Sequence, residues 1–177
     1  HTLARVGQPK AHSAREAMAA INPDPVVDTL LQRADAALLE RLVPTAQVVL
    51  DCTDNFATRH AINRACVRHG VPLVSGAAIR FDGQLAVYDP RDTASPCYAC
   101  VFPESADMEE VRCATMGVFA PLVGIIGTMQ AAEALKLLCG VGTSLAGRLQ
   151  MLDARTMEWN EVRVPRIASC PVCSNRG

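Results

Sequence analysis

The chain has 177 residues, 50% of them hydrophobic, which is enough for one domain with a sizeable core. A formal net charge of −1 and an aromatic content of 4% argue against a nucleic-acid-binding surface, which needs clustered basic residues and stacking rings. The longest apolar run, Val118 to Met129, is too short to span a bilayer, and Gln130, Glu133 and Lys136 follow it. We therefore expect a cytoplasmic protein with neither a membrane nor a nucleic acid as partner.

The amino-terminal part predicts two helices. Apolar residues recur at helical spacing between Pro9 and Asn22, and Pro9 suits a first turn because its missing N–H costs nothing there. A second, short helix is predicted around residues 38–42, and Pro44 should break it.

A strand–helix–strand unit is predicted next. Val48-Val49-Leu50 is a short apolar run, typical of a parallel strand covered on both faces. A helix follows, with Ile62 and Cys66 on one face and Gly70 as its stop, and then residues 71–75 predict a second buried strand. This order indicates an α/β fold whose crossover is right-handed.

The rest of the chain predicts strands around one long helix. We see no internal repeat and no linker long enough to separate domains, so residues 1–177 are expected to form a single domain. The further elements are a strand at residues 83–89, a loop from Pro90 to Pro96, a helix from Ala120 to Cys139 closed by Gly140, and a hairpin of strands at residues 149–153 and 158–164.

Two Cys-x-x-Cys pairs, Cys97/Cys100 and Cys170/Cys173, are the most informative motif. Four thiolates so paired predict one tetrahedral zinc site, although buried or disulfide-bonded cysteines remain an alternative. A single pair would also suit a redox motif, but two matching pairs favour zinc. A reducing, intracellular compartment fits this mixture of paired and scattered cysteines, the scattered ones being Cys52, Cys66, Cys113 and Cys139.

Asp51 and Asp54 follow the first predicted strand, and ligands of open α/β sheets collect at such strand ends. Asp54 could face Mg²⁺ or a phosphate-bound metal, whereas Asp54 or Asn55 could equally cap the next helix, and residue chemistry alone favours the cap. Lys10 could reach a phosphate as a point charge, but by itself a solvated lysine at a helix start is the more common role.

Cys113 lies in a charged segment, beside Arg112, a cation that favours a thiolate. A nucleophile and an inert exposed cysteine both remain open for this residue.

Seven motifs, in this order and over the whole chain, resemble the HesA/MoeB/ThiF family, the bacterial relatives of ubiquitin-activating enzymes. The motifs are Gly7-Gln8-Pro9-Lys10, Asp51-Cys52-Thr53-Asp54-Asn55, Leu73-Val74-Ser75-Gly76-Ala77, Cys97-Tyr98-Ala99-Cys100, the apolar stretch from Gly117 to Gly124, Glu133-Ala134-Leu135-Lys136 and Cys170-Pro171-Val172-Cys173.

The resemblance implies a Rossmann-like α/β fold with a mixed sheet, the carboxyl-terminal part of such an enzyme, and a structural zinc site. It implies ATP- and Mg²⁺-dependent transfer of AMP to the carboxyl-terminal glycine of a ubiquitin-like sulfur carrier, ThiS-like or MoaD-like, for thiamine or molybdopterin synthesis. A sulfur donor such as a cysteine desulfurase or rhodanese and a homodimer are implied as partners.

The resemblance also implies roles for single residues. Lys10 would contact the triphosphate, Asp54 would hold Mg²⁺ or orient the α-phosphate, and Asn55 is assigned with them to the nucleotide site. Cys113 falls where thiamine-type members carry the cysteine that links covalently to the carrier. The Cys113 motif and the last cysteine pair resemble thiamine-type members, whereas residues 75–80 resemble molybdopterin-type ones, so the pathway stays open.

One family feature is missing from these residues. No G-x-G-x-x-G occurs in them, so the glycine-rich phosphate loop is expected to lie before His1, and the chain by itself is expected not to adenylylate a carrier. The alternative function is a non-catalytic, zinc-stabilised module that binds the carrier.

Overall fold

The computed structural model describes residues 2–104 and 116–176, and the chain forms two compact units, His1–Ala34 and Asp35–Gly177. The first unit contains a short 3-10 helix, η1 (Leu3–Arg5), and the helix α1 (Lys10–Ile21). Asn22 stands directly after α1, as the sequence predicts, whereas Pro9 is the residue directly before the helix and does not lie in its first turn. The single-domain assignment of the whole chain stays a prediction.

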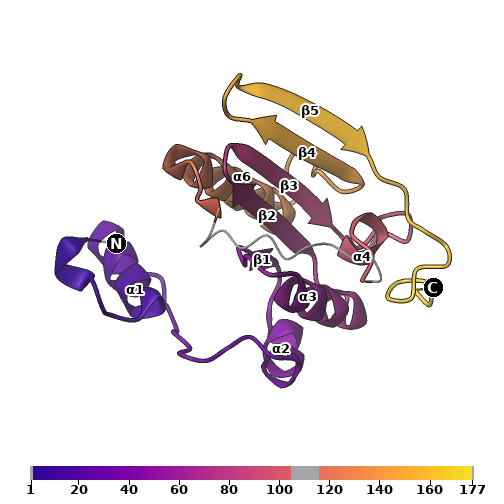
Figure 1. Cartoon of the computed structure of the whole chain (residues 1–177). Coiled ribbons are helices and arrows are strands. Elements are labelled where there is room, and N and C mark those ends of the chain that lie inside the picture. Colours follow the sequence, from indigo (N-terminus) through magenta and orange to yellow (C-terminus); the bar gives the residue numbers. More distant parts are fainter. Residues whose placement is uncertain (1, 105–115, 177) are drawn as a thin grey trace. The chain divides into compact units, whose positions relative to one another are not determined.

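The second unit is an α/β unit that contains both helices and strands (Figure 1). Its elements are α2 (Ala36–Leu42), η2 (Val43–Thr45), β1 (Val49–Asp51), α3 (Phe56–His69), β2 (Leu73–Ile79), β3 (Asp82–Tyr88), α4 (Tyr98–Val101), α6 (Ala120–Cys139), β4 (Arg148–Asp153) and β5 (Glu158–Arg163).

The five strands form one mixed sheet in the order β1-β2-β3-β4-β5. β1 pairs with β2 in parallel across α3, and the three other pairings are antiparallel, so the predicted mixed sheet and strand–helix–strand unit are confirmed. β1 lies at an edge of this sheet, and Leu50 is 42% exposed. The expectation that both faces of this strand are covered is therefore wrong for the residues that the structure describes.

Each predicted helix stop is found. The α-helical part of α2 ends at Leu42, and Pro44 lies inside η2. α3 and α6 end at Gly70 and Gly140, whose φ angles of 68° and 64° are left-handed and therefore suit glycine. The second strand differs more: β2 runs from Leu73 to Ile79, beyond the predicted residues 71–75, because its second half pairs with β3.

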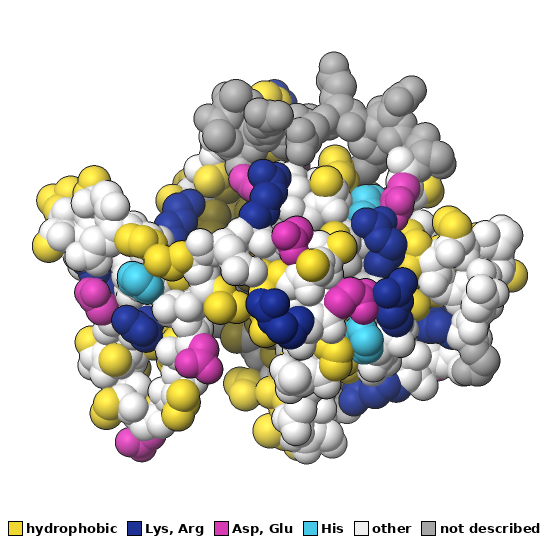
Figure 2. Space-filling view, turned by 90° about the horizontal axis from the view of Figure 1, so that it is seen from below, with side chains coloured by type: hydrophobic (Ala, Val, Ile, Leu, Met, Phe, Trp, Pro, Cys, Tyr) yellow, Lys and Arg dark blue, Asp and Glu magenta, His cyan; other side chains and the backbone are white. Residues whose placement is uncertain are grey.

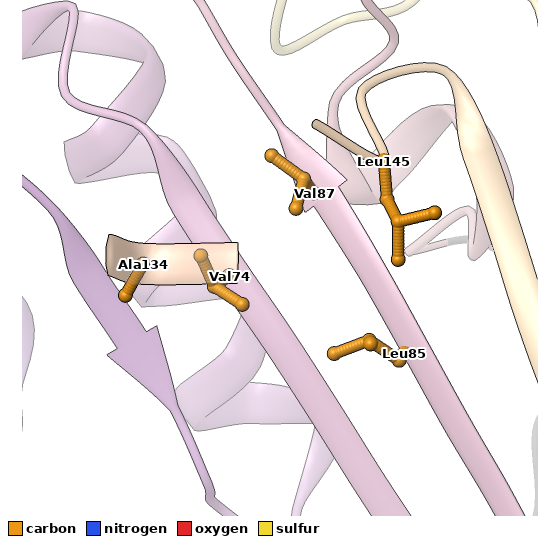
Figure 3. Packing of buried hydrophobic residues seen from close by; sticks show 5 residues of the cluster. All are labelled: Val74, Leu85, Val87, Ala134 and Leu145. Atoms are coloured by element: carbon orange, nitrogen blue, oxygen red, sulfur yellow. The ribbon is translucent and has the colours of Figure 1, made fainter. Parts of the chain in front are cut away.

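The core lies between the sheet and α6. Figure 3 shows the side chains of β2 and β3 with Ala134 of α6 and the loop residue Leu145: Val74, Leu85, Val87, Ala134 and Leu145. A second cluster joins Leu122 and Ile126 of α6 to Leu152 of β4. This packing places α6 against β2, β3 and β4, and β2 in turn pairs with β1, the strand that Asp54 follows.

α6 is the one helix in the described part of the chain that is long and apolar enough to cross a membrane by length and composition, with a mean hydropathy of 1.4. Its buried polar side chains form hydrogen bonds to other elements of the unit. Gln130 bonds backbone carbonyls of β1 and β2, and Glu133 accepts from the Leu145 N–H at 2.9 Å and pairs with Lys136 at 2.5 Å. These contacts are those of a helix docked on a sheet.

Candidate functional site

The four paired cysteines come together in one buried cluster, which we call the thiolate cluster: Cys97, Cys100, Cys170 and Cys173. All four thiols are free, and their sulfur atoms lie within 4.8 Å of one another. Tight turns hold each pair: the Cys100 N–H donates to the Cys97 carbonyl at 3.0 Å, and the Ser174 N–H to the Cys170 carbonyl at 2.9 Å. The cluster could hold a metal ion.

The spacing of the sulfur atoms fits a tetrahedral metal. Metal–sulfur bonds of about 2.3 Å in a tetrahedron place sulfur atoms about 3.8 Å apart. The observed Sγ–Sγ distances are 3.9 Å for Cys97–Cys100, 3.7 Å for Cys97–Cys170 and 3.5 Å for Cys100–Cys173. Side chains from two segments far apart in sequence thus already stand at tetrahedral spacing.

Two polar side chains next to the thiolate cluster favour its charged form. Asn63 of α3 directs its side-chain N–H₂ at Cys97 Sγ, 3.6 Å away, and opposes the rise in the pKa of Cys97 that burial causes. Arg166 binds the carbonyls of Cys173, Ser174 and Arg176 at 2.6–3.1 Å, which puts a positive charge beside the second cysteine pair. Sequence reasoning missed both residues, because neither belongs to the cysteine motif.

The loop after β1, residues 51–55, is called here the Asp54 loop. Asp51 shapes it: the carboxylate is 1% exposed, and its Oδ1 accepts from the Thr53 N–H at 2.8 Å and the Thr53 hydroxyl at 2.7 Å. Asp51 Oδ2 is buried and has no hydrogen-bond partner in residues 2–104 and 116–176. Asp51 is therefore a turn-forming residue at the carboxyl end of a parallel strand.

Asn55 and Asp54 divide the two roles that the sequence left open. Asn55 caps α3, since its side-chain oxygen accepts from the Thr58 N–H at 2.9 Å. Asp54, one residue earlier, has an exposed side chain. The cap is thus provided by Asn55, and the Asp54 carboxylate stands at the strand end where a ligand can reach it. The assignment of either residue to a nucleotide stays a prediction.

Gln130 of α6 holds the ends of β1 and β2 together. Its side-chain N–H₂ donates to the carbonyls of Asp51 at 2.9 Å and Val74 at 3.2 Å, and its oxygen accepts from the Cys52 thiol at 3.4 Å. A Cβ on Gly76 would lie 2.3 Å from Gln130 Cδ, so glycine is required for this approach. The sequence signal was a glutamine interrupting an apolar helix, opposite a glycine in a strand.

The two other predicted site residues, Lys10 and Cys113, lie outside the described part of the unit that contains the Asp54 loop. Lys10 is the exposed first residue of α1, in the unit His1–Ala34. Cys113 lies outside the described residues. Among the scattered cysteines, burial raises the pKa of Cys66 to about 12, which makes its thiol an inert part of the core.

The face that α2 and α3 present carries interspersed basic, acidic and histidine side chains (Figure 2). Glu40 of α2 pairs with Arg68 at 2.9 Å and with His69 at 2.8 Å, and the His69 bond lowers the pKa of Glu40. Because charges of both signs alternate there, this face offers no basic surface for nucleic acid.

Fold and site together define a class: an α/β protein with a ligand-accessible acidic loop at a parallel strand end and a four-cysteine cluster. The model of the ThiF family matches residues 1–172, and the chain belongs to this family. It is 44% identical over 176 residues to "Molybdopterin-synthase adenylyltransferase" of Escherichia coli, and 41% over 172 residues to "Sulfur carrier protein ThiS adenylyltransferase" of the same organism.

These matches cover 98% and 97% of this chain but 69% and 67% of the two relatives. A solved structure, "Crystal structure of E. coli MccB + ATP", superimposes with a TM-score of 0.81 at 19% identity, over 99% of this chain and 54% of that one. It supports the fold predicted from the sequence. The chain thus spans about two thirds of the named relatives and about half of that solved chain.

Proposed function

We propose that the protein transfers AMP from ATP to the carboxyl-terminal glycine of a ubiquitin-like sulfur carrier, in thiamine or molybdopterin synthesis. The observation that carries the proposal is the exposed Asp54 carboxylate at the end of β1, in a chain so similar to two sulfur-carrier adenylyltransferases. The carrier would be ThiS-like or MoaD-like, since the identities of 44% and 41% favour neither strongly.

The chemistry requires that like charges be brought together. A carboxylate must attack the α-phosphate of ATP, and the negative charge of both reactants has to be neutralised for that approach. In the proposal Asp54 holds Mg²⁺ or orients the α-phosphate, Lys10 contacts the triphosphate, and Asn55 fixes the loop by capping α3. Bound Mg²⁺ would supply the charge neutralisation, and these side chains would supply position.

We assign zinc to the thiolate cluster as a structural ion. The assignment is supported by four buried thiols at tetrahedral spacing and by the Asn63 donor at Cys97. The chemistry of the donor set favours zinc, because four thiolates with no open position make a closed site. The cluster would tie the carboxyl-terminal segment to α4, which contains Cys100 and begins directly after Cys97.

The proposal includes parts that these residues do not contain. A glycine-rich phosphate loop is expected in the segment that the longer relatives carry, and the domain would be one ThiF/MoeB-type domain completed by it. A homodimer, a cysteine desulfurase or rhodanese as sulfur donor, a role for Cys113 in sulfur transfer, and a cytoplasmic location complete the proposal.

ATP–pyrophosphate exchange tests this function. The protein encoded by the natural gene is assayed with a ThiS-like carrier, a MoaD-like carrier, and each carrier without its terminal glycine. We expect exchange with at least one intact carrier, none with the truncated ones, and none from residues 1–177 alone. A folded, metal-loaded protein that binds a carrier without any exchange would establish the alternative, a non-catalytic carrier-binding module.

A further inference from the structure

α3 contacts both candidate sites, at points one helical turn apart. Arg59 and Asn63 are four residues apart and therefore lie on the same face of this helix. Asn63 bonds the segment that contains Cys97, whereas Arg59 bonds the Asp54 loop. The thiolate cluster and the Asp54 loop thus share one rigid element.

The contacts of Asn63 fix the orientation of its side chain. Its oxygen accepts from the Tyr98 N–H at 2.9 Å, and a backbone N–H can only donate, so the N–H₂ group must point to Cys97 Sγ at 3.6 Å. Asn63 is 1% exposed, so neither bond can be replaced by bulk water. Asn63 therefore contacts the turn at Cys97–Cys100 at two points, the backbone N–H of Tyr98 and the sulfur of Cys97.

Arg59 holds the other end. Its Nε and Nη2 both donate to the Thr53 carbonyl, at 3.1 and 2.6 Å, directly before Asp54.

Arg59 also lines a cavity of about 10 Å³ together with Tyr98, the residue after Cys97. The Tyr98 hydroxyl is buried without a hydrogen-bond partner in the described residues, and the cavity has room for one water molecule. The Tyr98 ring also packs on His60 of α3, at 5.2 Å between centroids.

We propose that Asn63 and Arg59 are positioning residues that make metal occupancy of the thiolate cluster set the order of the Asp54 loop. When the metal is bound, Cys97 and Tyr98 are held in place. Their bonds to Asn63 then hold α3 in position, and Arg59 on the same helix holds the Thr53 carbonyl. When the metal is lost, the Cys97 turn is released, and the Thr53–Asn55 backbone opens more often. The relevance to adenylylation rests on the proposed function, but the coupling itself does not.

Amide hydrogen exchange tests the coupling without nucleotide or carrier. The zinc-loaded, full-length protein is compared with the same protein after chelation, and exchange is read in peptides covering residues 52–58. We expect chelation to accelerate exchange there about tenfold, as local opening does when its free energy falls. Metal content is measured on each sample, so a failure of the zinc assignment is seen separately from a failure of the coupling.

Two variants locate the coupling and one controls for it. In Asn63→Ala, kept loaded by excess zinc, and in Arg59→Lys, whose single nitrogen cannot replace both Nε and Nη2 at the Thr53 carbonyl, residues 52–58 should exchange fast with or without chelator. Arg59→Lys should keep one metal per chain, so it remains informative if Asn63→Ala fails to fold. Arg68→Ala, exposed on the same helix, should respond to chelation as the wild type does.

The proposal is overturned if chelation leaves exchange at residues 52–58 unchanged while residues 97–101 lose protection. It is also overturned if Arg59→Lys and Asn63→Ala respond to chelation as strongly as the wild type, or if the wild-type protein holds no metal.

Discussion

The thiolate cluster and the Asp54 loop both contact α3, but they differ in burial and in what they need to be complete. The four cysteines are buried, spaced at 3.5–3.9 Å, and need only a metal ion to be complete. The Asp54 loop presents an exposed carboxylate, whose proposed ligands are Mg²⁺ and the α-phosphate of ATP. Changes in the cluster should therefore reduce stability first, whereas changes at Asp54 should reduce activity at constant stability.

The largest effect is expected at the cluster. Cys173→Ala should release the metal and destabilise the protein by several kcal/mol, because structural zinc contributes about 10–16 kcal/mol of binding free energy to folding in small zinc modules. Metal analysis and urea unfolding measure both effects. Cys139→Ala, an exposed cysteine outside the cluster, is the matched control and should change neither. Unchanged metal content in Cys173→Ala would refute the four-cysteine site.

Substitution of Asp54 tests whether the Asp54 loop contributes to activity without contributing to stability. Asp54→Asn should lower carrier-dependent pyrophosphate exchange about 100-fold, the size of effect seen when one charge-stabilising group is removed from an active site. Its urea midpoint should stay at the wild-type value because the side chain is exposed. Asp51→Ala should show the reverse order of effects, losing stability because it removes Oδ1, which accepts two hydrogen bonds in a buried turn. Loss of stability in Asp54→Asn would contradict this division of roles.

Gly76 tests how firmly the strand ends are held. In Gly76→Ala the new methyl group would displace the Gln130 side chain, which is fixed by its bonds to Asp51, Val74 and Cys52. We expect a loss of about 1–3 kcal/mol in the free energy of unfolding, typical of overpacking. Gly124→Ala, an exposed α6 site with no atom within 4 Å of the new Cβ, should instead stabilise by up to about 1 kcal/mol. Equal effects at both glycines would show that Gln130 is not held.

The smallest effect is expected from pH. Burial lowers the pKa of His60, partly opposed by Glu104, whose carboxylate is 3.5 Å from Nδ1, while Arg64 lowers it further. The unfolded chain, with an ordinary histidine pKa of about 6.5, then binds more protons than the folded one below that pH. Stability should therefore be full above pH 6.5 and fall as the pH decreases. In His60→Gln the slope of unfolding free energy against pH should be smaller over that window; an identical slope would exclude His60 as a cause.

Local sequence signals predicted what depends on neighbours in the chain. The ends of α6 follow from Pro121 in the first turn and Gly140 after the last, and the thiolate cluster follows from cysteine spacing alone. The cysteines could be paired without knowing the fold, because two half-sites of two sulfurs complete one tetrahedron.

Local sequence signals did not predict contacts between residues that are distant in the chain. Gly76, Ala77 and Ala78 in the second half of β2 have little strand preference, and the strand extends through them to Ile79 because β3 pairs with it. Arg59 and Asn63 looked like ordinary polar residues of a helix. Their role depends on which loops the fold brings to α3, and on a distance of 34 residues between Asn63 and Cys97 in the chain.

The central claim, that a carrier receives AMP at its terminal glycine, is tested most directly by the intact mass of the carrier. The full-length protein is incubated with carrier, ATP and Mg²⁺, then quenched in acid. We expect a carrier species heavier by one AMP, absent with the carrier that lacks its last glycine and strongly reduced with Asp54→Asn. A folded, zinc-containing protein that leaves the mass of both carrier types unchanged would contradict it.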